Sequence, residues 1–197
     1  DIRPSRGLGD VYKRQACTSL FCGACAQCLQ GRPHLCSDRD ACRRPAGSPP
    51  RLSLDGDPVH QFVDLGAFAE YLLVHERSLV VVDPDIPLDR AALSGCSVTT
   101  GVGAALNAAQ VRPGSTVAVF GAGGVGVSVI QGARIAGARQ IIAIDLVDAK
   151  LEQARHFGAT DVINPARDDA VRTIKRLSNG GVDFSFEAVG NADLVQQ

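Results

Sequence analysis

The sequence predicts an α/β protein in two parts, of which the first is β-rich and irregular and the second is built on a parallel sheet. Three observations support this prediction. Four cysteines crowd into residues 22–36, strand patterns alternate with helix patterns from about residue 98, and a glycine-rich turn separates the first strand of that series from its helix. We therefore divide the chain into a first part at 16–97, which contains the crowded cysteines, and a second part at 98–197, which contains the parallel sheet.

The composition is that of an ordinary globular chain. Of the 197 residues, 45% are hydrophobic and 21% are charged, and the formal net charge is −1. This balance offers no electrostatic basis for binding nucleic acid or an anionic membrane surface. No apolar run approaches the roughly 20 residues that a membrane-spanning helix needs. The seven cysteines are odd in number and crowded, which favours a reducing compartment over a disulfide framework, so we expect a cytoplasmic protein.

Both ends of the chain look cut. It starts at Asp1 with DIRPSRGLGDVYKRQ, which looks like a translated library adapter, and it stops in NADLVQQ, where a helix pattern is beginning. We therefore treat residues 1–15 as a non-native leader and set them aside when predicting the fold.

In the first part, residues 17–42 form the cysteine lobe, which is too rich in Cys and Gly to hold much regular structure. Residues 43–60 are polar and rich in proline, so we expect a surface loop or a weak hairpin around Asp55 and Gly56. Apolar, β-branched runs bounded by polar turns then predict strands. The elements expected there are strands at 66–74 and 78–82 and a short helix starting at 88–93.

In the second part, strand and helix patterns alternate with short connections. Its first strand is a continuous apolar run, and the helix after it carries small residues on one face. Strands that alternate with helices give a parallel sheet covered on both faces. The expected strands span 116–120, 140–144, 161–163 and 182–187, and the expected helices span 124–136, 149–157 and 168–177.

Cys22, Cys25, Cys28 and Cys36 follow the spacing Cys-x2-Cys-x2-Cys-x7-Cys. A short loop with this spacing can wrap four thiolates around one tetrahedral zinc and leave no position open for chemistry. The alternatives are an iron–sulfur cluster, a redox-active disulfide pair and free buried thiols. A ferredoxin-like run would place its fourth cysteine four residues after the third instead of eight. We therefore favour a structural zinc that clips a loop with little core.

Gly121, Gly123 and Gly126 form the pattern G-x-G-x-x-G after a β-rich run and at the start of a helix, and in this setting the pattern predicts a dinucleotide site. The first glycine permits a tight turn, the second lets the backbone approach a pyrophosphate, and the third lets helix and strand pack closely. The helix that begins at Gly124 offers N–H groups and a positive dipole end to the phosphates. The alternative is that the glycines serve only helix–sheet packing.

Asp145 ends the second expected strand, nineteen residues after Gly126. A carboxylate there can accept both ribose hydroxyls of an adenosine and repels a 2′-phosphate, which predicts NAD rather than NADP. Leu146 follows, where an NADP site more often has Arg, and Lys150 lies one turn further, within reach of the same ribose. The alternative is that Asp145 is a helix N-cap.

Cys96 stands between Gly95 and Ser97, and by itself it would be a small buried residue. Its context SGCSVTTGVGA, however, resembles the segment of medium-chain zinc alcohol dehydrogenases that carries the third protein ligand of the catalytic zinc. The resemblance runs from about Cys17 to Val195 and is closest to bacterial zinc alcohol dehydrogenases and glutathione-dependent formaldehyde dehydrogenases. The cysteine lobe and the segments GAFAEYLLVHERSLVVVDPDIPLDRAALSGC, VTTG, GAGGVG, AIDLVDAK and DFSFEAVG occur in that family in this order.

The resemblance implies part of a GroES-like catalytic domain with a structural zinc lobe, followed by part of a Rossmann domain. The family's other catalytic-zinc ligands, its Gly-His-Glu segment and its proton relay have no match here. We therefore give no role to Cys17, Cys42 or the histidines His34, His60, His75 and His156, which we expect at the surface or half-buried. The roles implied are structural zinc for Cys22, Cys25, Cys28 and Cys36, catalytic zinc for Cys96, a position near the nicotinamide for Thr100, a position that backs the cofactor for Val125, and the adenosine ribose for Asp145 and Lys150.

The activity implied is hydride transfer between NAD and a primary or secondary alcohol, or a hydroxymethyl adduct, at a catalytic zinc. The partners implied are a small alcohol or aldehyde and, at full length, further copies in a homodimer or homotetramer. This chain alone is expected to be inactive. Two other interpretations remain: a non-catalytic nucleotide-binding module with a structural zinc, and a zinc-ribbon nucleic-acid binder. The latter predicts basic and aromatic residues around the cysteines, where residues 21–36 hold only Arg32 and Phe21.

Overall fold

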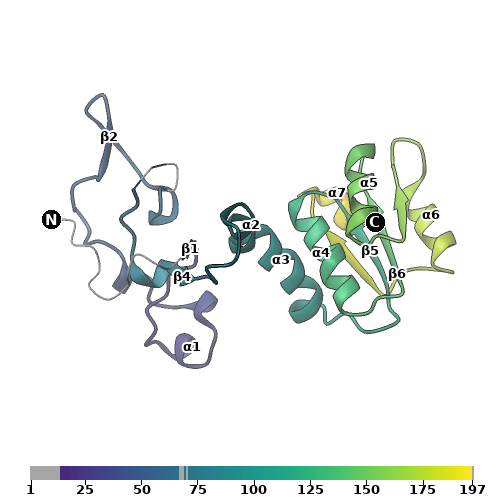
Figure 1. Cartoon of the computed structure of the whole chain (residues 1–197), viewed down its shortest axis with the longest axis horizontal. Coiled ribbons are helices and arrows are strands. Elements are labelled where there is room, and N and C mark those ends of the chain that lie inside the picture. The colour runs from purple at the N-terminus through teal and green to yellow at the C-terminus, as the bar shows by residue number, and fades with distance from the viewer. Residues whose placement is uncertain (1–13, 67–68, 70, 197) are drawn as a thin grey trace. The chain divides into compact units, whose positions relative to one another are not determined.

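The structure is a computed structural model that describes residues 14–66, 69 and 71–196. It forms two compact units, of which unit 1 ends at Gly95 and unit 2 begins at Cys96 (Figure 1). Among the described residues, no helix has both the length and the apolar character needed to cross a membrane.

Unit 1 consists of short strands and helical turns. Strand β1 (Arg14–Ala16) pairs antiparallel with β4 (Leu79–Val81). Arg14 and Gln15 fall within the expected leader at 1–15, but they take part in this pairing. The other elements of unit 1 are α1 (Ala26–Leu29), α2 (Leu88–Leu93) and the 3-10 turns η1 (Pro33–Leu35), η2 (Asp40–Cys42), η3 (Phe62–Asp64) and η4 (Glu76–Ser78), together with the hairpin strands β2 and β3.

The hairpin expected around Asp55 and Gly56 is present. Strands β2 (Leu52–Leu54) and β3 (Asp57–Val59) pair antiparallel across these two residues. Both turn residues have positive φ, 52° at Asp55 and 92° at Gly56. Two successive residues with positive φ form the type I′ turn, whose twist matches that of the paired strands.

The strand expected at 66–74 is wrong for the part of that segment that the structure describes. Residues 71–74 form no strand, and positions 67, 68 and 70 lie outside the described residues. Tyr71 is 89% exposed and Leu73 is 54% exposed. An apolar run becomes a strand only where neighbouring strands and a core pack against it. The second expected strand, at 78–82, has such a neighbour and forms β4.

Unit 2 contains the expected parallel sheet, made of β5 (Thr116–Phe120), β6 (Gln140–Ile144), β7 (Asp161–Ile163) and β8 (Phe184–Glu187). The strand order is β7-β6-β5-β8, so the chain moves outward from β5 to β7 and then returns to the other side of β5. This reversal creates a topological switch point between the carboxyl ends of β5 and β8. Doubly wound sheets bind their ligands at such a point.

Helices cover both faces of this sheet (Figure 1). On one face lie α4 (Gly124–Ile135), α5 (Asp148–Phe157) and the π-helical turn η6 (Ala104–Ala108), packed on β5 and β6 through residues such as Val117 and Ile141. On the other face lie α6 (Ala170–Leu177) and α7 (Ala192–Val195), packed around Phe120 and Ile142. Because β5 and β6 are buried on both sides, their sequences are continuous apolar runs.

Helix α3 (Thr99–Gly103), which follows the π-helical turn η5 (Ser94–Val98), packs closely against α4. A Cβ atom at Gly101 would lie 2.4 Å from the Val125 carbonyl oxygen, and one at Gly132 would lie 2.9 Å from Ala105 Cβ. The small residues expected on one face of the 124–136 helix therefore serve this close contact. It holds residues 96–100 beside the start of α4.

Four boundaries in unit 2 differ from the expected ones: α4 ends one residue early at Ile135, α5 begins one residue early at Asp148, and two elements begin two residues late. The helix expected from 168 begins at Ala170, because the Asp169 carboxylate accepts the Arg172 N–H and caps the helix there. The strand expected from 182 begins at Phe184; Asp183, just before it, accepts the Thr116 N–H with its carboxylate and donates its own N–H to the Thr116 carbonyl.

Candidate metal centre and nucleotide cleft

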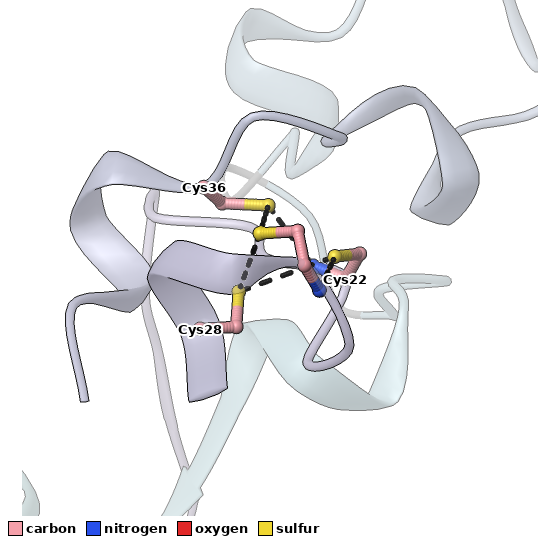
Figure 2. Close-up of side chains that lie close together, drawn as sticks. Cys22, Cys28 and Cys36 are labelled. Atoms are coloured by element: carbon pink, nitrogen blue, oxygen red, sulfur yellow. Dashed lines mark hydrogen bonds between the residues drawn. The ribbon is translucent and has the colours of Figure 1, made fainter. Parts of the chain in front are cut away.

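The four lobe cysteines lie together, with all four sulfur atoms within 4.8 Å of one another (Figure 2). The Cys25 sulfur is 3.5 Å from that of Cys28 and 3.9 Å from that of Cys36, and the Cys22 and Cys28 sulfurs are 4.0 Å apart. Four sulfurs each about 2.3 Å from one zinc stand roughly 3.8 Å apart in a tetrahedron. The donor set and its spacing therefore fit a tetrathiolate zinc centre, and all seven cysteines of the chain are free of disulfide bonds.

The backbone of the lobe turns its N–H groups toward the sulfurs. Cys22 N–H donates to Cys36 Sγ at 3.3 Å, and Cys25 N–H donates to Cys22 Sγ at 3.3 Å. The short helix α1 begins directly after Cys25 and places Cys28 three residues further on the same side. Such N–H groups stabilise thiolates and orient them, as outer contacts do around metal ligands.

The thiol pKa values follow from these contacts. The Cys28 N–H lowers the pKa of Cys25 to about 5, and the Cys22 N–H lowers the pKa of Cys36. Burial, with the neighbouring Cys25 sulfur, raises the pKa of Cys28 to about 12. A bound dication would take the place of the protons on these sulfurs.

The remaining cysteines and the histidines of unit 1 lie outside this cluster. Cys42 donates its S–H to the Phe21 carbonyl at 3.3 Å, and the Cys17 sulfur accepts the Ser19 N–H at 3.4 Å. As expected, His34, His60 and His156 are exposed and His75 is half-buried. Within the described residues, the four lobe cysteines are the one group of three or more metal-ligating side chains.

The three motif glycines have three different surroundings. Gly121 has φ +93°, and a Cβ atom there would lie 2.8 Å from Val189 Cγ2. A Cβ atom at Gly126 would lie 1.7 Å from the Gly121 carbonyl oxygen, so a side chain cannot fit between the helix and the turn. Around Gly123 there is no atom within 4 Å of the Cβ position. The turn is therefore tight at its first glycine, close-packed at its third and open at its second.

The Asp145 carboxylate lies against the glycine turn. Its Oδ2 accepts the Ala122 N–H at 2.8 Å, and its Oδ1 accepts the Val147 N–H at 2.9 Å. The Lys150 ammonium lies 3.9 Å from Oδ2, and the Asp145 side chain is 10% exposed. The N-cap of α5 is Val147, so Asp145 lies before the helix and is not its N-cap. Each carboxylate oxygen retains a further lone pair for another donor.

A cleft of about 930 Å³ opens at the carboxyl ends of the strands. Such a volume suits a small-molecule or cofactor site. The glycine turn lines it, together with Ile144 at the end of β6 and Asp145 directly after it. The residues that line it include Gly121, Gly123, Asp145, Lys150, Val189 and Asn191.

Cys96 is exposed and lies in η5, which corrects its interpretation as a small buried residue. Its neighbour Ser97 packs on the first turn of α4, because a Cβ atom at Gly124 would lie 3.3 Å from Ser97 Cβ. Thr100 is also exposed and precedes Gly101, the contact point with Val125 on α4. Cys96, Thr100, Val125 and the glycine turn thus belong to one unit and to adjoining elements.

Sequence reasoning missed two side chains that hold the loops lining the cleft. Asn164 is buried after β7, and its amide donates to the Leu146 carbonyl at 3.1 Å and to the Asp148 carboxylate at 2.8 Å. Glu187 ends β8 and accepts three backbone N–H groups of the following loop. The signal that identifies both is their place: each is a polar residue at the carboxyl end of a parallel strand, beside the ligand crevice.

Residues 124–197 match the family described as zinc-binding dehydrogenase. S-(hydroxymethyl)glutathione dehydrogenase of Saccharomyces cerevisiae is 42% identical over 184 residues, which are 89% of this chain and 48% of that protein. A crystal structure described as an alcohol dehydrogenase zinc-binding domain protein from Burkholderia ambifaria has a TM-score of 0.80 and 37% identity, covering 91% of this chain and 50% of that one. Benzyl alcohol dehydrogenase from Acinetobacter calcoaceticus has a TM-score of 0.75 and 35% identity, covering 91% of this chain and 50% of that one.

The cysteine lobe, the Rossmann sheet and these matches resemble those of medium-chain zinc-dependent dehydrogenases. Residues 124–197 belong to the zinc-binding dehydrogenase family, and the chain as a whole is similar to alcohol and S-(hydroxymethyl)glutathione dehydrogenases. It spans about half the length of the curated relatives it matches.

Proposed function

We propose that this chain carries the NAD site and the structural zinc lobe of an alcohol dehydrogenase. The complete enzyme would transfer a hydride between NAD and a primary or secondary alcohol, or a hydroxymethyl adduct. The observation that carries this proposal is the cleft at the switch point, where the open glycine turn and the Asp145 carboxylate meet. The similarity to S-(hydroxymethyl)glutathione dehydrogenase and benzyl alcohol dehydrogenase supports the substrate class.

In this proposal each part of the cleft binds one part of NAD. The open backbone at Gly123 and the N–H groups of the α4 start, at Gly124, Val125 and Gly126, receive the pyrophosphate. Asp145 and Lys150 bind the adenosine ribose, Thr100 lies near the nicotinamide, and Val125 backs the cofactor. When bound, NAD supplies the hydride acceptor, and the chain's task is to hold it in position.

The proposal includes two zinc sites, one with all of its ligands in this chain and one with a single ligand here. Cys22, Cys25, Cys28 and Cys36 form a full tetrahedral donor set that would tie the lobe together. Cys96 is proposed as one ligand of the catalytic zinc. The described residues hold no group of three metal-ligating side chains that includes Cys96. The other ligands of that metal would therefore come from the part of the complete enzyme that lies outside this chain.

A metal analysis tests the lobe. The 197-residue chain purified without added metal should contain one zinc per chain. Cys28→Ser should lose that zinc, whereas the matched control Cys42→Ser should keep it, because the Cys42 thiol donates to the Phe21 carbonyl and lies outside the cluster. Iron with acid-labile sulfide, or a chain without metal, would contradict the assignment.

An activity test addresses Cys96. The chain is joined to the segments that extend beyond it in the relative from S. cerevisiae, and alcohol-dependent NADH formation is followed. Cys96→Ser should abolish turnover while the structural zinc and NAD binding remain, and Cys42→Ser should retain turnover. Full activity of the Cys96→Ser protein would refute its role as a metal ligand.

The compartment and assembly belong to the same proposal. We propose a cytoplasmic location, supported by the seven free thiols, and we expect a homodimer or homotetramer at full length. The alternative function is a non-catalytic nucleotide-binding module with a structural zinc. It predicts NAD binding without turnover in the joined protein, so the same assay separates the two.

A further inference from the structure

Glu187 lies at the carboxyl end of β8, directly opposite Phe120 at the end of β5. Its Oε1 accepts the N–H groups of Val189 at 2.7 Å, Gly190 at 2.8 Å and Asn191 at 3.4 Å. We propose that Glu187 is a positioning residue of the nucleotide cleft, whose carboxylate fixes the loop 188–191 as the wall that faces the glycine turn. This inference deepens the proposed function and rests on it.

The loop held by Glu187 touches the glycine turn itself. A Cβ atom at Gly121 would lie 2.8 Å from Val189 Cγ2 and 3.0 Å from the Ala188 carbonyl oxygen. Val189 and Asn191 also line the cleft. At a switch point the two loops that follow the diverging strands form the crevice. The loop after β8 therefore sets the width of the cleft over Gly121.

A single carboxylate oxygen organises this loop. Three successive N–H groups converge on Oε1, and hydrogen bonds to an ionised acceptor are stronger than neutral ones. The Val189 N–H lowers the pKa of Glu187, which agrees with a carboxylate that stays ionised. Gly190, with φ +85°, supplies the left-handed turn that aims these N–H groups at one point.

Asp183 provides a matched control at the other end of β8. Its Oδ2 accepts the Thr116 N–H at 2.7 Å and the Thr116 hydroxyl at 2.8 Å, so it ties β8 to β5 by the same kind of contact. Neither carboxylate lines the cleft itself, but Glu187 holds Val189 and Asn191, which do, whereas Asp183 holds Thr116, which does not. A residue that only stabilises the strand pair and a residue that shapes the cleft can thus be compared within one strand.

The experiment uses the 197-residue chain with the variants Glu187→Ala, Glu187→Gln and Asp183→Ala. Amide hydrogen exchange is measured at Val189, Gly190 and Asn191, and the dissociation constant for NAD is measured on the same samples. Glu187→Ala should speed exchange at these three amides and weaken NAD binding, each by roughly tenfold, since three bonds to a charged acceptor are lost. Glu187→Gln retains an oxygen acceptor and should recover most of both effects.

Asp183→Ala should lower thermal stability but leave the exchange of the three amides and the NAD affinity of the folded chain within about twofold. Unchanged exchange in Glu187→Ala would overturn the proposal whether or not NAD binds. Faster exchange with unchanged NAD affinity would overturn the proposal that the loop held by Glu187 shapes the NAD cleft. A wild-type chain that binds no NAD would count against the proposed function, and the exchange rates would still decide whether Glu187 fixes the loop.

Discussion

At the scale of single residues, Asp145 combines two tasks. Its two carboxylate oxygens hold the N–H groups of Ala122 and Val147, so it braces the glycine turn and the start of α5. The same carboxylate lines the cleft, where it is proposed to bind a ribose. A substitution that removes the whole side chain therefore changes the shape and the charge of the site together.

Asp145→Asn removes the negative charge but keeps part of the hydrogen bonding to the neighbouring loops. Asn retains an oxygen acceptor for one loop N–H and loses the negative charge that would repel a 2′-phosphate. The ratio of NADP to NAD affinity should rise by roughly tenfold, because removing one repulsion between charges about 4 Å apart is worth about 1 kcal/mol or more. Isothermal titration with both nucleotides measures this ratio.

The control for this prediction is Lys150→Gln, which removes the cation 3.9 Å from Asp145 and keeps the carboxylate. It should weaken both nucleotides without raising the ratio. An unmutated chain that binds NADP as tightly as NAD would show that Asp145 does not discriminate between them.

At the scale of elements, the contact between α3 and α4 depends on glycine. A Cβ atom at Gly101 would lie 2.4 Å from the Val125 carbonyl oxygen and 2.7 Å from the Val129 nitrogen. These are backbone atoms, so a methyl group there must separate the two helices. The cost bears on function because this contact also places Thr100 beside α4.

Gly101→Ala should therefore destabilise unit 2 by about 1–3 kcal/mol, the usual cost of overpacking. The matched control is Gly103→Ala in the same helix, where the nearest atom to the Cβ position is 4.0 Å away. That variant should gain about 0.5–1 kcal/mol because alanine restricts the unfolded chain. Urea unfolding followed by circular dichroism measures both, and equal stability of the two variants would contradict the close helix contact.

The pairing of β5 with β8 carries a pH dependence through Asp183. The Thr116 N–H and hydroxyl lower the pKa of this carboxyl below its ordinary value of 3.8. A depressed pKa in the folded state means that the contact stabilises the fold above pH 3.8 and that this stabilisation is lost as the pH falls through the lower, folded value.

The melting temperature of the wild-type chain should accordingly exceed that of Asp183→Ala at neutral pH, and the difference should shrink as the solution is acidified below pH 3.8. Thermal melts across a range from about pH 3 to about pH 7 test this. A difference that is constant over that range would show that Asp183 contributes no charged hydrogen bond.

At the scale of the whole molecule, the four strands of unit 2 build the switch point, and the described residues provide one candidate ligand for a catalytic metal. A single thiolate does not hold a catalytic zinc, which takes three protein ligands and keeps one position open. The 197-residue chain should therefore bind NAD and show no alcohol-dependent NADH formation above background. A panel of alcohols with the chain and with the joined protein measures this, and NADH formation by the chain alone would refute it.

The bounds of the elements in unit 2 could be predicted from the sequence almost to the residue. The strands 116–120, 140–144 and 161–163 have the predicted bounds, and the first two read as unbroken apolar runs because they are buried on both faces. The cysteine cluster and the glycine turn were likewise predictable, since each is a local geometry formed within a few residues. In unit 1 the same reasoning succeeded at Asp55–Gly56, where the turn is local, and failed at 66–74, where pairing depends on distant strands.

Which polar groups come into contact across the sheet could be learned only from the tertiary structure. The contact of Asp145 with the Ala122 N–H spans 23 residues, and Val189 lies near Gly121 although it follows β8, much later in the chain. No periodicity predicts such contacts, because they arise where β6 and β8 pair with the two sides of β5. Local patterns fix backbone conformation through sterics and burial, whereas a cleft is made by loops that only the strand order brings together.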